Sequence, residues 1–316
     1  MKALITGGAG FVGSYLIDHL LNDYKWSVCV TKMNNNEFNR NDIDIYNLDI
    51  LNKQDIINLL NDIQPDYIFH LAAQSSVALS WKNPALTIDV NIKGTVNLLD
   101  AVRETGLWPK ILLIGSGEEY GHIKTDETPI LEDNVIRPGN IYAATKAAQN
   151  YLGKIYSDAY NMDIIMVRAF NHIGPNQSPI FVVADFCKQV AEIEKGLKEP
   201  VIKVGNLSAQ RDFTDVRDVV RAYAFIIQKG KRGETYNVGS GKAVSIEEIL
   251  NIILSKTSLE IKVEVDKNKL RPVDIPIIEA DITKIKEITG WQNTINLEET
   301  IADTLNYWRF KIDQEK

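Results

Sequence analysis

The 316-residue chain is poor in cysteine, in net basic charge and in long apolar runs. Its two cysteines, Cys29 and Cys187, lie far apart and lack the paired spacing of a metal-binding or redox motif. We therefore expect buried free thiols, a reducing compartment and no metal site. The formal net charge of −7 argues against a nucleic-acid backbone or an anionic membrane surface as the main partner.

Signals for export or membrane insertion are also missing from this sequence. Met1 and Lys2 run directly into ALITGGAGFVG, which leaves no room for a signal peptide. No later run approaches the roughly 18 apolar residues that a membrane helix needs. We expect a cytoplasmic protein, and a hydrophobic content of 45% is enough for one large domain or two moderate ones.

Short apolar runs alternate with longer amphipathic runs in the first half of the chain. KALIT, WSVCV, YIFHL, ILLIG and DIIMVRAF are typical of buried strands, whereas KQDIINLLNDI and TVNLLDAVRE between them are typical of helices. This order predicts an α/β fold, a Rossmann-like doubly wound parallel sheet with helices on both faces.

The pattern loosens after about Phe170, where prolines interrupt the segments, and a helical run, DVRDVVRAYAFIIQK, returns later. We therefore predict a second, smaller α/β domain. The predicted cofactor domain covers residues 1–170 and is rejoined by about 216–238. The predicted substrate domain covers 171–215 and 239–316.

The strongest local signal is ALITGGAGFVG, which places glycines between the first strand and the next helix. Gly7, Gly10 and Gly13 permit a tight turn and close backbone approach, and the helix N-terminus offers N–H groups to a pyrophosphate. Such spacing alone is a weak motif, but here a strand and a helix flank it. We predict a dinucleotide site that includes Phe11 and Val12.

The end of the second strand favours NADP over NAD as the cofactor. Nicotinamide sites that bind NAD place an acidic residue there, whereas this chain has Thr31 and Lys32, whose ammonium suits a 2′-phosphate. Asp49 and Ile50, after the third strand, are positional candidates for the adenine contact. The alternative is that Lys32 is an ordinary surface lysine.

The fourth strand ends in HLAAQSS at the carboxyl edge of the predicted sheet. The small side chains of Ala72 and Ala73 would let the backbone lie against a nicotinamide ribose, or would simply allow tight helix packing. We include Leu71 and Gln74 in the predicted cofactor site and Ser75 in the predicted substrate site.

YAATK places Tyr142 and Lys146 four residues apart, on one face of a helix. A nearby cation stabilises a phenolate and lowers the phenol pKa, so that Tyr142 can act as a general acid or base. The fifth strand ends at Ser116 in GSGEEYG, where the hydroxyl can steady a carbonyl oxygen. Glu118, two residues later, is placed to take a proton from carbon, so the motif permits both keto reduction and elimination of water.

TGGAGFVG, Ser116, and Tyr142 with Lys146 resemble the extended short-chain dehydrogenase/reductase family over the whole chain. FNHIGP, VGNLSAQRDFTDVRDVVRAY and LRPVDIP resemble enzymes acting on GDP-mannose-derived sugars, most closely the GDP-4-keto-6-deoxy-D-mannose reductases. The resemblance implies NADPH-dependent reduction at C4 to GDP-D-rhamnose or its C4 epimer, with Tyr142 as proton donor. It further implies that Ser116 bonds the substrate O4, that Lys146 tunes Tyr142 and holds the nicotinamide ribose, and that the enzyme is a homodimer.

The same resemblance implies contacts to the sugar diphosphate from the second domain. The candidates are Asn171, Arg211, Arg271 and Asp274. Independently, an acidic protein that binds a nucleotide diphosphate needs local cations, and the arginine fork matches phosphate oxygens. The three aspartates Asp212, Asp215 and Asp218 are predicted to cap or flank a helix instead.

Two alternatives remain at this point. One is a sugar-nucleotide 4,6-dehydratase or 4-epimerase that uses tightly bound NAD(P), which Glu118 permits and which Gly117 and the lack of an Arg-rich stretch after the second strand disfavour. The other is a regulator that senses NADP without turnover, which the intact Ser116, Tyr142 and Lys146 disfavour. Guanine as the base rests on the resemblance alone.

Overall fold

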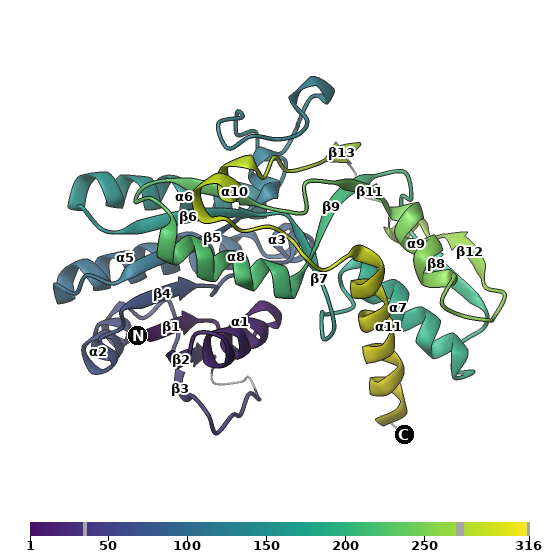
Figure 1. Cartoon of the computed structure of the whole chain (residues 1–316), viewed down its shortest axis with the longest axis horizontal. Helices are drawn as coiled ribbons and strands as arrows, with labels where there is room; N and C mark the ends of the chain where they lie inside the picture. The colour runs from purple at the N-terminus through teal and green to yellow at the C-terminus, as the bar shows by residue number, and fades with distance from the viewer. Residues whose placement is uncertain (34–36, 270–274, 315–316) are drawn as a thin grey trace.

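The computed structural model describes residues 1–33, 37–269 and 275–314. Within these residues, a parallel sheet of seven strands has the order β10-β6-β5-β4-β1-β2-β3 (Figure 1). The strands are β1 Lys2–Thr6, β2 Ser27–Lys32, β3 Asp44–Asn47, β4 Tyr67–His70, β5 Lys110–Ser116, β6 Ile164–Ala169 and β10 Thr235–Val238. The predicted doubly wound parallel sheet is therefore confirmed.

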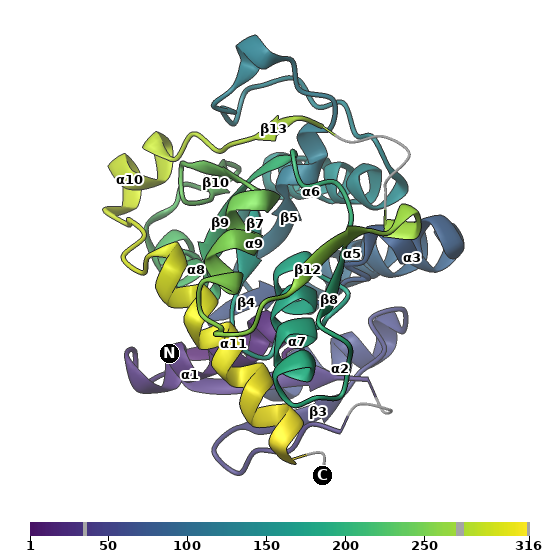
Figure 2. The same ribbon diagram turned by 90° about the vertical axis from the view of Figure 1, so that its right-hand side faces the viewer.

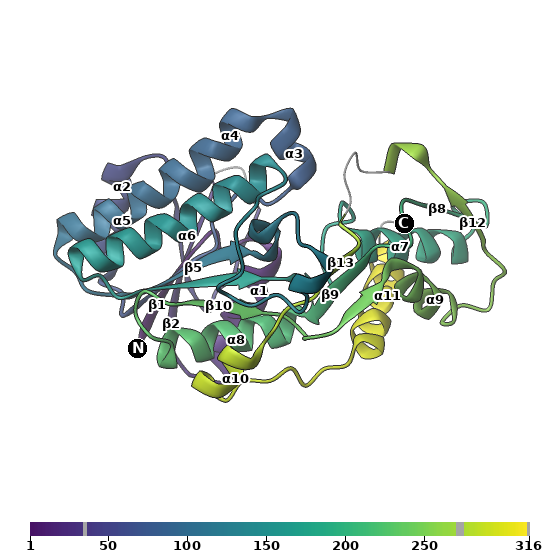
Figure 3. The same ribbon diagram turned by 90° about the horizontal axis from the view of Figure 1, so that it is seen from above.

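Helices cover both faces of this sheet, which explains why its central strands are apolar throughout (Figure 3). One face carries α2, α5 and α6, and the other carries α1, α8 and α10. Their bounds are α1 Phe11–Asn22, α2 Lys53–Ile63, α5 Gly94–Thr105, α6 Ile141–Tyr160, α8 Val216–Lys229 and α10 Thr283–Thr289. A helical segment precedes α5 and comprises α3 Val77–Lys82, then, after a break at Asn83, α4 Pro84–Ile88 and a π-helix, Asp89–Lys93.

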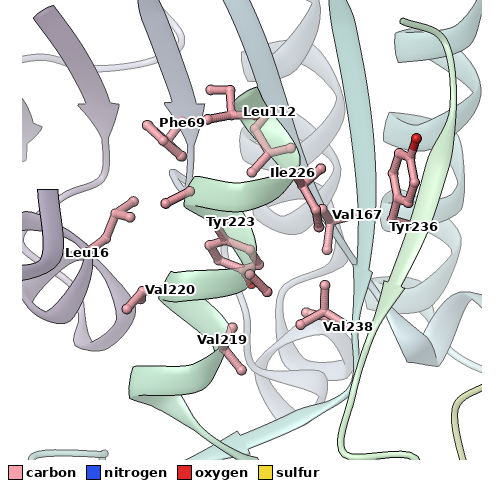
Figure 4. Close-up of a cluster of buried hydrophobic side chains, with 14 of the residues drawn as sticks. Leu16, Phe69, Leu112, Val167, Val219, Val220, Tyr223, Ile226, Tyr236 and Val238 are labelled. Carbon is pink, nitrogen blue, oxygen red and sulfur yellow. The ribbon is translucent and has the colours of Figure 1, made fainter. Parts of the chain in front are cut away.

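The side of the sheet that faces α8 forms the largest apolar cluster (Figure 4). Val219 and Tyr223 on α8 pack toward Val167 of β6 and Val238 of β10, and all four side chains are buried. Because β10 follows α8, the chain has to return to the first sheet after leaving it at β6. The long apolar face of α8 holds that return in place.

A smaller lobe is built from the remaining segments, on the side where the first sheet's strands end (Figure 2). Its strands are β7 Asn171–Ile173, β8 Val201–Val204, β9 Gln210–Asp215, β11 Ala243–Ser245, β12 Lys262–Val265 and β13 Ile277–Ile278. Three helices, α7 Val182–Glu194, α9 Ile246–Leu254 and α11 Leu297–Gln314, bury a second apolar cluster that includes Phe186, Ile249 and Trp308. No helix in the described ranges is both long and apolar enough to span a bilayer.

The three aspartates of DFTDVRD accept buried hydrogen bonds, and the predicted place at a helix start holds for Asp215 and Asp218 but not for Asp212, which binds the turn after β10. Asp215 is the N-cap of α8 and accepts from the Arg217 N–H at 2.7 Å. Asp212 accepts from the N–H groups of Ser240 and Gly241 at 2.6 and 2.9 Å. Asp218 accepts from backbone N–H groups of the segment that leads into α11. These buried bonds fix the position of the lobe relative to the sheet.

Candidate active site

The strand β5 and the helix α6 bring together three of the four predicted catalytic residues, and the fourth, Glu118, follows β5 directly. Ser116 is the last residue of β5, and its side chain acts on the Tyr142 phenol in the first turn of α6, where it lowers the pKa of that phenol. Lys146 lies one turn further along α6 and is only 4% exposed. The arrangement places a hydroxyl, a phenol and an ammonium at the carboxyl edge of the central strands, where open α/β sheets bind ligands.

The Lys146 ammonium is held by two acceptors. It donates to the Ile114 carbonyl at 2.7 Å and to Gln149 Oε1 at 3.0 Å. Burial lowers the pKa of Lys146 to about 8, and the negative charge of Glu119 opposes that fall. Lys146 therefore titrates in a range where its charge matters to a reaction run near neutral pH.

Tyr142 differs from the sequence-based expectation that Lys146 lowers its pKa. Burial raises the pKa of Tyr142, the hydrogen bond from Ser116 opposes the rise, and the charges of Glu118 and Glu119 add to it. Burial disfavours a phenolate, and the Lys146 ammonium is turned toward Ile114 and Gln149. A protonated Tyr142 is suited to donate a proton rather than to accept one.

The segment after Ser116 is a 3-10 helix, Gly117–Tyr120, closed by a capping box. Ser116 Oγ accepts from the Glu118 N–H at 3.2 Å, and Glu119 Oε1 accepts from the Ser116 N–H at 2.9 Å. The Glu119 carboxylate also pairs with Arg168 of β6 at 2.9 Å, and both side chains are buried. Neither Glu119 nor Arg168 is predicted as a site residue from the sequence.

Asn140 is a further residue that the sequence analysis missed. Its side-chain oxygen caps α6 by accepting from the Ala143 N–H at 2.8 Å, and its Nδ2 donates to Glu118 Oε2 at 3.1 Å. An Asn directly before an apolar helical run is a recognisable N-cap signal. The contact to Glu118 crosses 22 residues of sequence and has no local signal.

The predicted glycine turn connects β1 and α1, and its geometry fits a dinucleotide. Gly7 has a φ of +69°, and a Cβ on Gly13 would lie 2.2 Å from the Gly8 carbonyl oxygen. Gly10 is exposed and is the N-cap of α1, where no side chain caps the first-turn N–H groups. Phe11 and Val12, which open the helix, are partly buried. The uncapped N–H groups can therefore receive a pyrophosphate.

The residues after the second and third strands have separate roles. Thr31 is buried and its hydroxyl accepts from the Gly7 N–H at 3.1 Å, so it supports the glycine turn from behind. Lys32 is partly exposed at the end of β2. Asp49 is exposed and available to a ligand, whereas the Ile50 side chain is buried against Gly94 of α5. The Ile50 side chain therefore belongs to the packing between the sheet and α5.

The segment after β4 lies beside the glycine turn, because Ala72 is the residue that a Cβ on Gly7 would meet at 2.7 Å. The backbone of Leu71 is bonded to Thr6, and Ala73 is partly exposed. Gln74 is tied to the π-helix through Asn91, whose Oδ1 accepts from the Gln74 N–H at 2.8 Å. Ser75 is exposed at this edge. The segment therefore lines the site mainly through its backbone.

Among the predicted substrate residues of the second domain, the structure describes Asn171 and Arg211. Asn171, at the start of β7, lines a small hollow together with Ser116, Gly117, Glu118, Ala169, Phe170 and Ile278. Arg211 lies in β9, mostly buried, and its NH1 group donates to the Ile275 and Gln210 carbonyls at 2.7 Å. Arg271 and Asp274 lie outside the described residues.

A glycine turn at a helix N-terminus, beside a Ser, Tyr and Lys at the ends of parallel strands, defines a nicotinamide-dependent enzyme of the short-chain dehydrogenase/reductase class. The model of one family, GDP-mannose 4,6 dehydratase, matches residues 4–304. The chain belongs to this family of extended short-chain dehydrogenases/reductases.

Individual relatives are similar over nearly the full length of the chain. A GDP-6-deoxy-D-mannose reductase of Pseudomonas aeruginosa is 29% identical, with 99% of each chain covered. A UDP-glucose 4-epimerase of Mycolicibacterium smegmatis is 31% identical, with 98% of this chain and 99% of the relative covered. The solved structure of RMD from Pseudomonas aeruginosa complexed with NADPH superposes with a TM-score of 0.87, at 29% identity, over 98% of this chain and 99% of that one.

Proposed function

We propose that this protein reduces the C4 keto group of GDP-4-keto-6-deoxy-D-mannose with NADPH, giving GDP-D-rhamnose or its C4 epimer. The observation that carries the proposal is that Ser116 acts on the Tyr142 phenol, with Lys146 one turn further along α6. These residues lie at the same edge of the sheet as the glycine turn. The similarity to a GDP-6-deoxy-D-mannose reductase over 99% of both chains supports the choice of substrate.

The proposed chemistry needs one hydride and one proton. NADPH supplies the hydride to C4 when it is bound, and Tyr142 gives its phenolic proton to O4. Ser116 donates a hydrogen bond to the same oxygen as its charge grows. Lys146 holds the nicotinamide ribose. Its ammonium offsets the negative charge that remains on Tyr142 after the phenolic proton has left.

The proposed cofactor site consists of the glycine turn with Lys32 and Asp49 on one side and the backbone of residues 71–74 on the other. Lys32 supports NADPH over NADH because an ammonium at the end of β2 attracts a 2′-phosphate, whereas an acidic residue there would repel it. The similar structure of RMD is complexed with NADPH, which agrees with this preference. NAD is the less favoured cofactor.

We also propose that the cofactor and the sugar nucleotide bind to different parts of the chain. Residues 1–170, with about 216–238, hold the cofactor, and 171–215 with 239–316 hold the sugar nucleotide. Ser75, Asn171, Arg211, Arg271 and Asp274 are the proposed substrate contacts. Hydrogen exchange tests the division, since NADPH should protect the first set of segments and GDP the second.

A 4,6-dehydratase remains the second candidate, because Glu118 lines the same hollow as Ser116 and belongs to a chain that matches the GDP-mannose 4,6 dehydratase model. The two activities differ in their use of cofactor. A reductase consumes one NADPH per keto sugar, whereas a dehydratase returns the hydride to the sugar and consumes none.

The deciding experiment supplies GDP-4-keto-6-deoxy-D-mannose with NADPH and follows the absorbance of NADPH and the NMR spectrum of the product. Stoichiometric loss of NADPH with a new C4 proton supports the reductase, and the coupling constants of that proton give the C4 configuration. Formation of a 4-keto sugar from GDP-mannose and NADP⁺ alone would instead make the protein a dehydratase. NADPH binding without either reaction would favour a regulator.

We also propose a homodimer formed through α4 and α6. Apolar side chains on these neighbouring helices are exposed, namely Leu86 (40%), Ile88 (46%), Tyr151 (58%) and Ile155 (56%). Exposed apolar side chains on adjacent helices are typical of a contact surface. Light scattering tests the dimer, with Ile155→Glu expected to shift the mass toward a monomer and Phe310→Glu, on α11, as the control.

A further inference from the structure

The buried pair of Glu119 and Arg168 lies directly beneath the catalytic residues. Glu119 is fully buried, and each of its two oxygens accepts from an N–H donor, Oε1 from the Ser116 backbone and Oε2 from Arg168 Nε. Burial raises the pKa of Glu119, while Arg168 and the Ser116 N–H oppose the rise. Acceptance at both oxygens is the pattern of an ionised carboxylate.

Glu119 and Lys146 bind to neighbouring peptide groups of one short segment of β5. Lys146 donates to the carbonyl of Ile114, and Glu119 accepts from the N–H of Ser116. Between them, a Cβ on Gly115 would lie 2.2 Å from Glu119 Oε1 and 2.5 Å from the Val167 carbonyl. The carboxylate therefore fills the space that a side chain at position 115 would occupy.

Arg168 anchors the other end of this arrangement. Its NH1 group donates to the Tyr120 hydroxyl at 2.9 Å and to the Glu132 carbonyl at 2.8 Å. Tyr120 in turn donates to Asn237 Oδ1 at 2.7 Å, next to the end of β10. The pair is thus locked on the side away from the catalytic groups, and its carboxylate has little freedom to move.

We propose that Glu119, held by Arg168, is a positioning residue for catalysis: it fixes Ser116 through the backbone and keeps the Lys146 ammonium protonated beside Tyr142. The inference rests on the proposed proton transfer from Tyr142. A buried ammonium without a counter-charge loses its proton, and Glu119 is the carboxylate that opposes this loss for Lys146.

The other charged groups near Lys146 do not take this role. His70 of β4 is buried, and burial, followed by the charge of Lys146, lowers its pKa to about 3, so it stays neutral. Glu118 is bonded to Asn140, and its charge acts on Tyr142. Arg168 has the same sign as Lys146, and the Tyr223 phenol on α8 is buried and protonated, because burial raises its pKa.

The test uses Glu119→Gln, which keeps an acceptor for the Ser116 N–H and removes the charge. Protein labelled with ¹³C at lysine Cε is titrated without substrate, and the Lys146 resonance is assigned by its loss in Lys146→Arg. We expect Lys146 to titrate at a lower pH in Glu119→Gln than in the unmodified protein. Relative turnover of the variant should fall roughly tenfold between about pH 6.5 and about pH 8.5, the factor expected for a displacement of one pH unit.

Two further variants keep the result interpretable. Glu119→Gln with Arg168→Met removes both charges, so it should fold even if the single variant leaves Arg168 unpaired. Its Lys146 titration should still move to lower pH, but by less than in the single variant, because a charge of the same sign as Lys146 is lost as well. Glu127→Gln, which breaks the partly exposed pair with Arg137, should leave the Lys146 titration unchanged. An unchanged Lys146 titration in the folded double variant would overturn the inference, whether or not the keto sugar proves to be the substrate.

Discussion

The amide of Asn140 holds the carboxylate of Glu118 at 3.1 Å while its oxygen caps the helix that carries Tyr142. One side chain therefore sets the geometry of the potential base and of the proton donor together. The hydrogen bond engages Glu118 Oε2, so it restrains the carboxylate in the hollow that it shares with Ser116. The restrained carboxylate is placed to hold the substrate, the role that the reductase proposal gives it.

Replacing Glu118 should therefore spare the reduction. In Glu118→Gln the amide keeps a hydrogen bond and loses only the ability to accept a proton, so we expect keto-sugar reduction to remain within about tenfold. Steady-state NADPH oxidation measures this change. Rapid formation of a 4-keto sugar from GDP-mannose that Glu118→Gln abolishes would contradict the reductase proposal.

Tyr142→Phe removes one hydroxyl and should leave the fold and NADPH binding intact. Loss of the general acid should lower turnover by roughly 10²-fold or more. Ser116→Ala should also lower turnover, because it removes a donor to the growing oxyanion. Circular dichroism and NADPH fluorescence serve as the controls, and near-normal turnover in Tyr142→Phe would show that another group donates the proton.

The buried Lys146 ammonium should destabilise the folded protein at neutral pH. Its folded pKa of about 8 lies below its ordinary value of 10.5, so the folded state disfavours the charged form. This penalty is complete below about pH 8 and disappears as the pH rises toward 10.5. Lys146→Met should abolish turnover yet raise the free energy of unfolding at pH 7 by up to about 3 kcal/mol.

Denaturant unfolding at several pH values checks the Lys146 prediction. The gain in Lys146→Met should shrink between about pH 8 and about pH 10.5, where the unmodified lysine is neutral in the folded state. An equal change at every pH would mean that packing, rather than charge, accounts for the effect.

Lys32→Asp should reduce or reverse the preference for NADPH. We expect a change of about 1–2 kcal/mol in the difference between NADPH and NADH binding, the range for a partly exposed charge-assisted hydrogen bond. Calorimetry with both cofactors measures it. Lys25→Asp is the control, since Lys25 is exposed before the opposite end of the same strand. Equal affinities for both cofactors in the unmodified protein would rule out the assignment.

Two glycines of the turn should respond differently to alanine. A Cβ at Gly13 would meet the Gly8 backbone at 2.2 Å, so Gly13→Ala should destabilise the fold by about 1–3 kcal/mol. A Cβ at Gly10 would lie 3.5 Å from its nearest neighbour, the Gly7 oxygen, so Gly10→Ala should keep the stability and weaken NADPH binding. Thermal melts with and without NADPH separate the two effects, and equal melting temperatures for both apo variants would contradict this account.

The sequence predicted those features that depend on neighbouring residues. The strand, turn and helix around Gly7–Gly13 have local signals, and so does the spacing of Tyr142 and Lys146 in α6. Pairings between distant segments had no such signal. Glu119 and Arg168 are 49 residues apart, and neither is unusual in its own stretch of sequence.

Burial is a second property that the local sequence does not show. The Ile50 side chain packs against Gly94, while the contact of this residue with adenine stays a prediction. The pKa of Tyr142 is raised because the phenol is buried, a property that the spacing of YAATK does not contain. Both depend on how helices close over the sheet, which only the assembled fold determines.

The position of β10 has a consequence for synthesis on the ribosome. Strand β6 ends at Ala169, but its outer neighbour in the sheet begins at Thr235. While the intervening residues are being made, β6 is an open edge of apolar sequence, and Arg168 lacks the Asn237 end of its hydrogen-bond network. Truncated chains that stop between these strands should therefore aggregate or recruit chaperones. Ribosome stalling in that interval should lower the yield of folded protein.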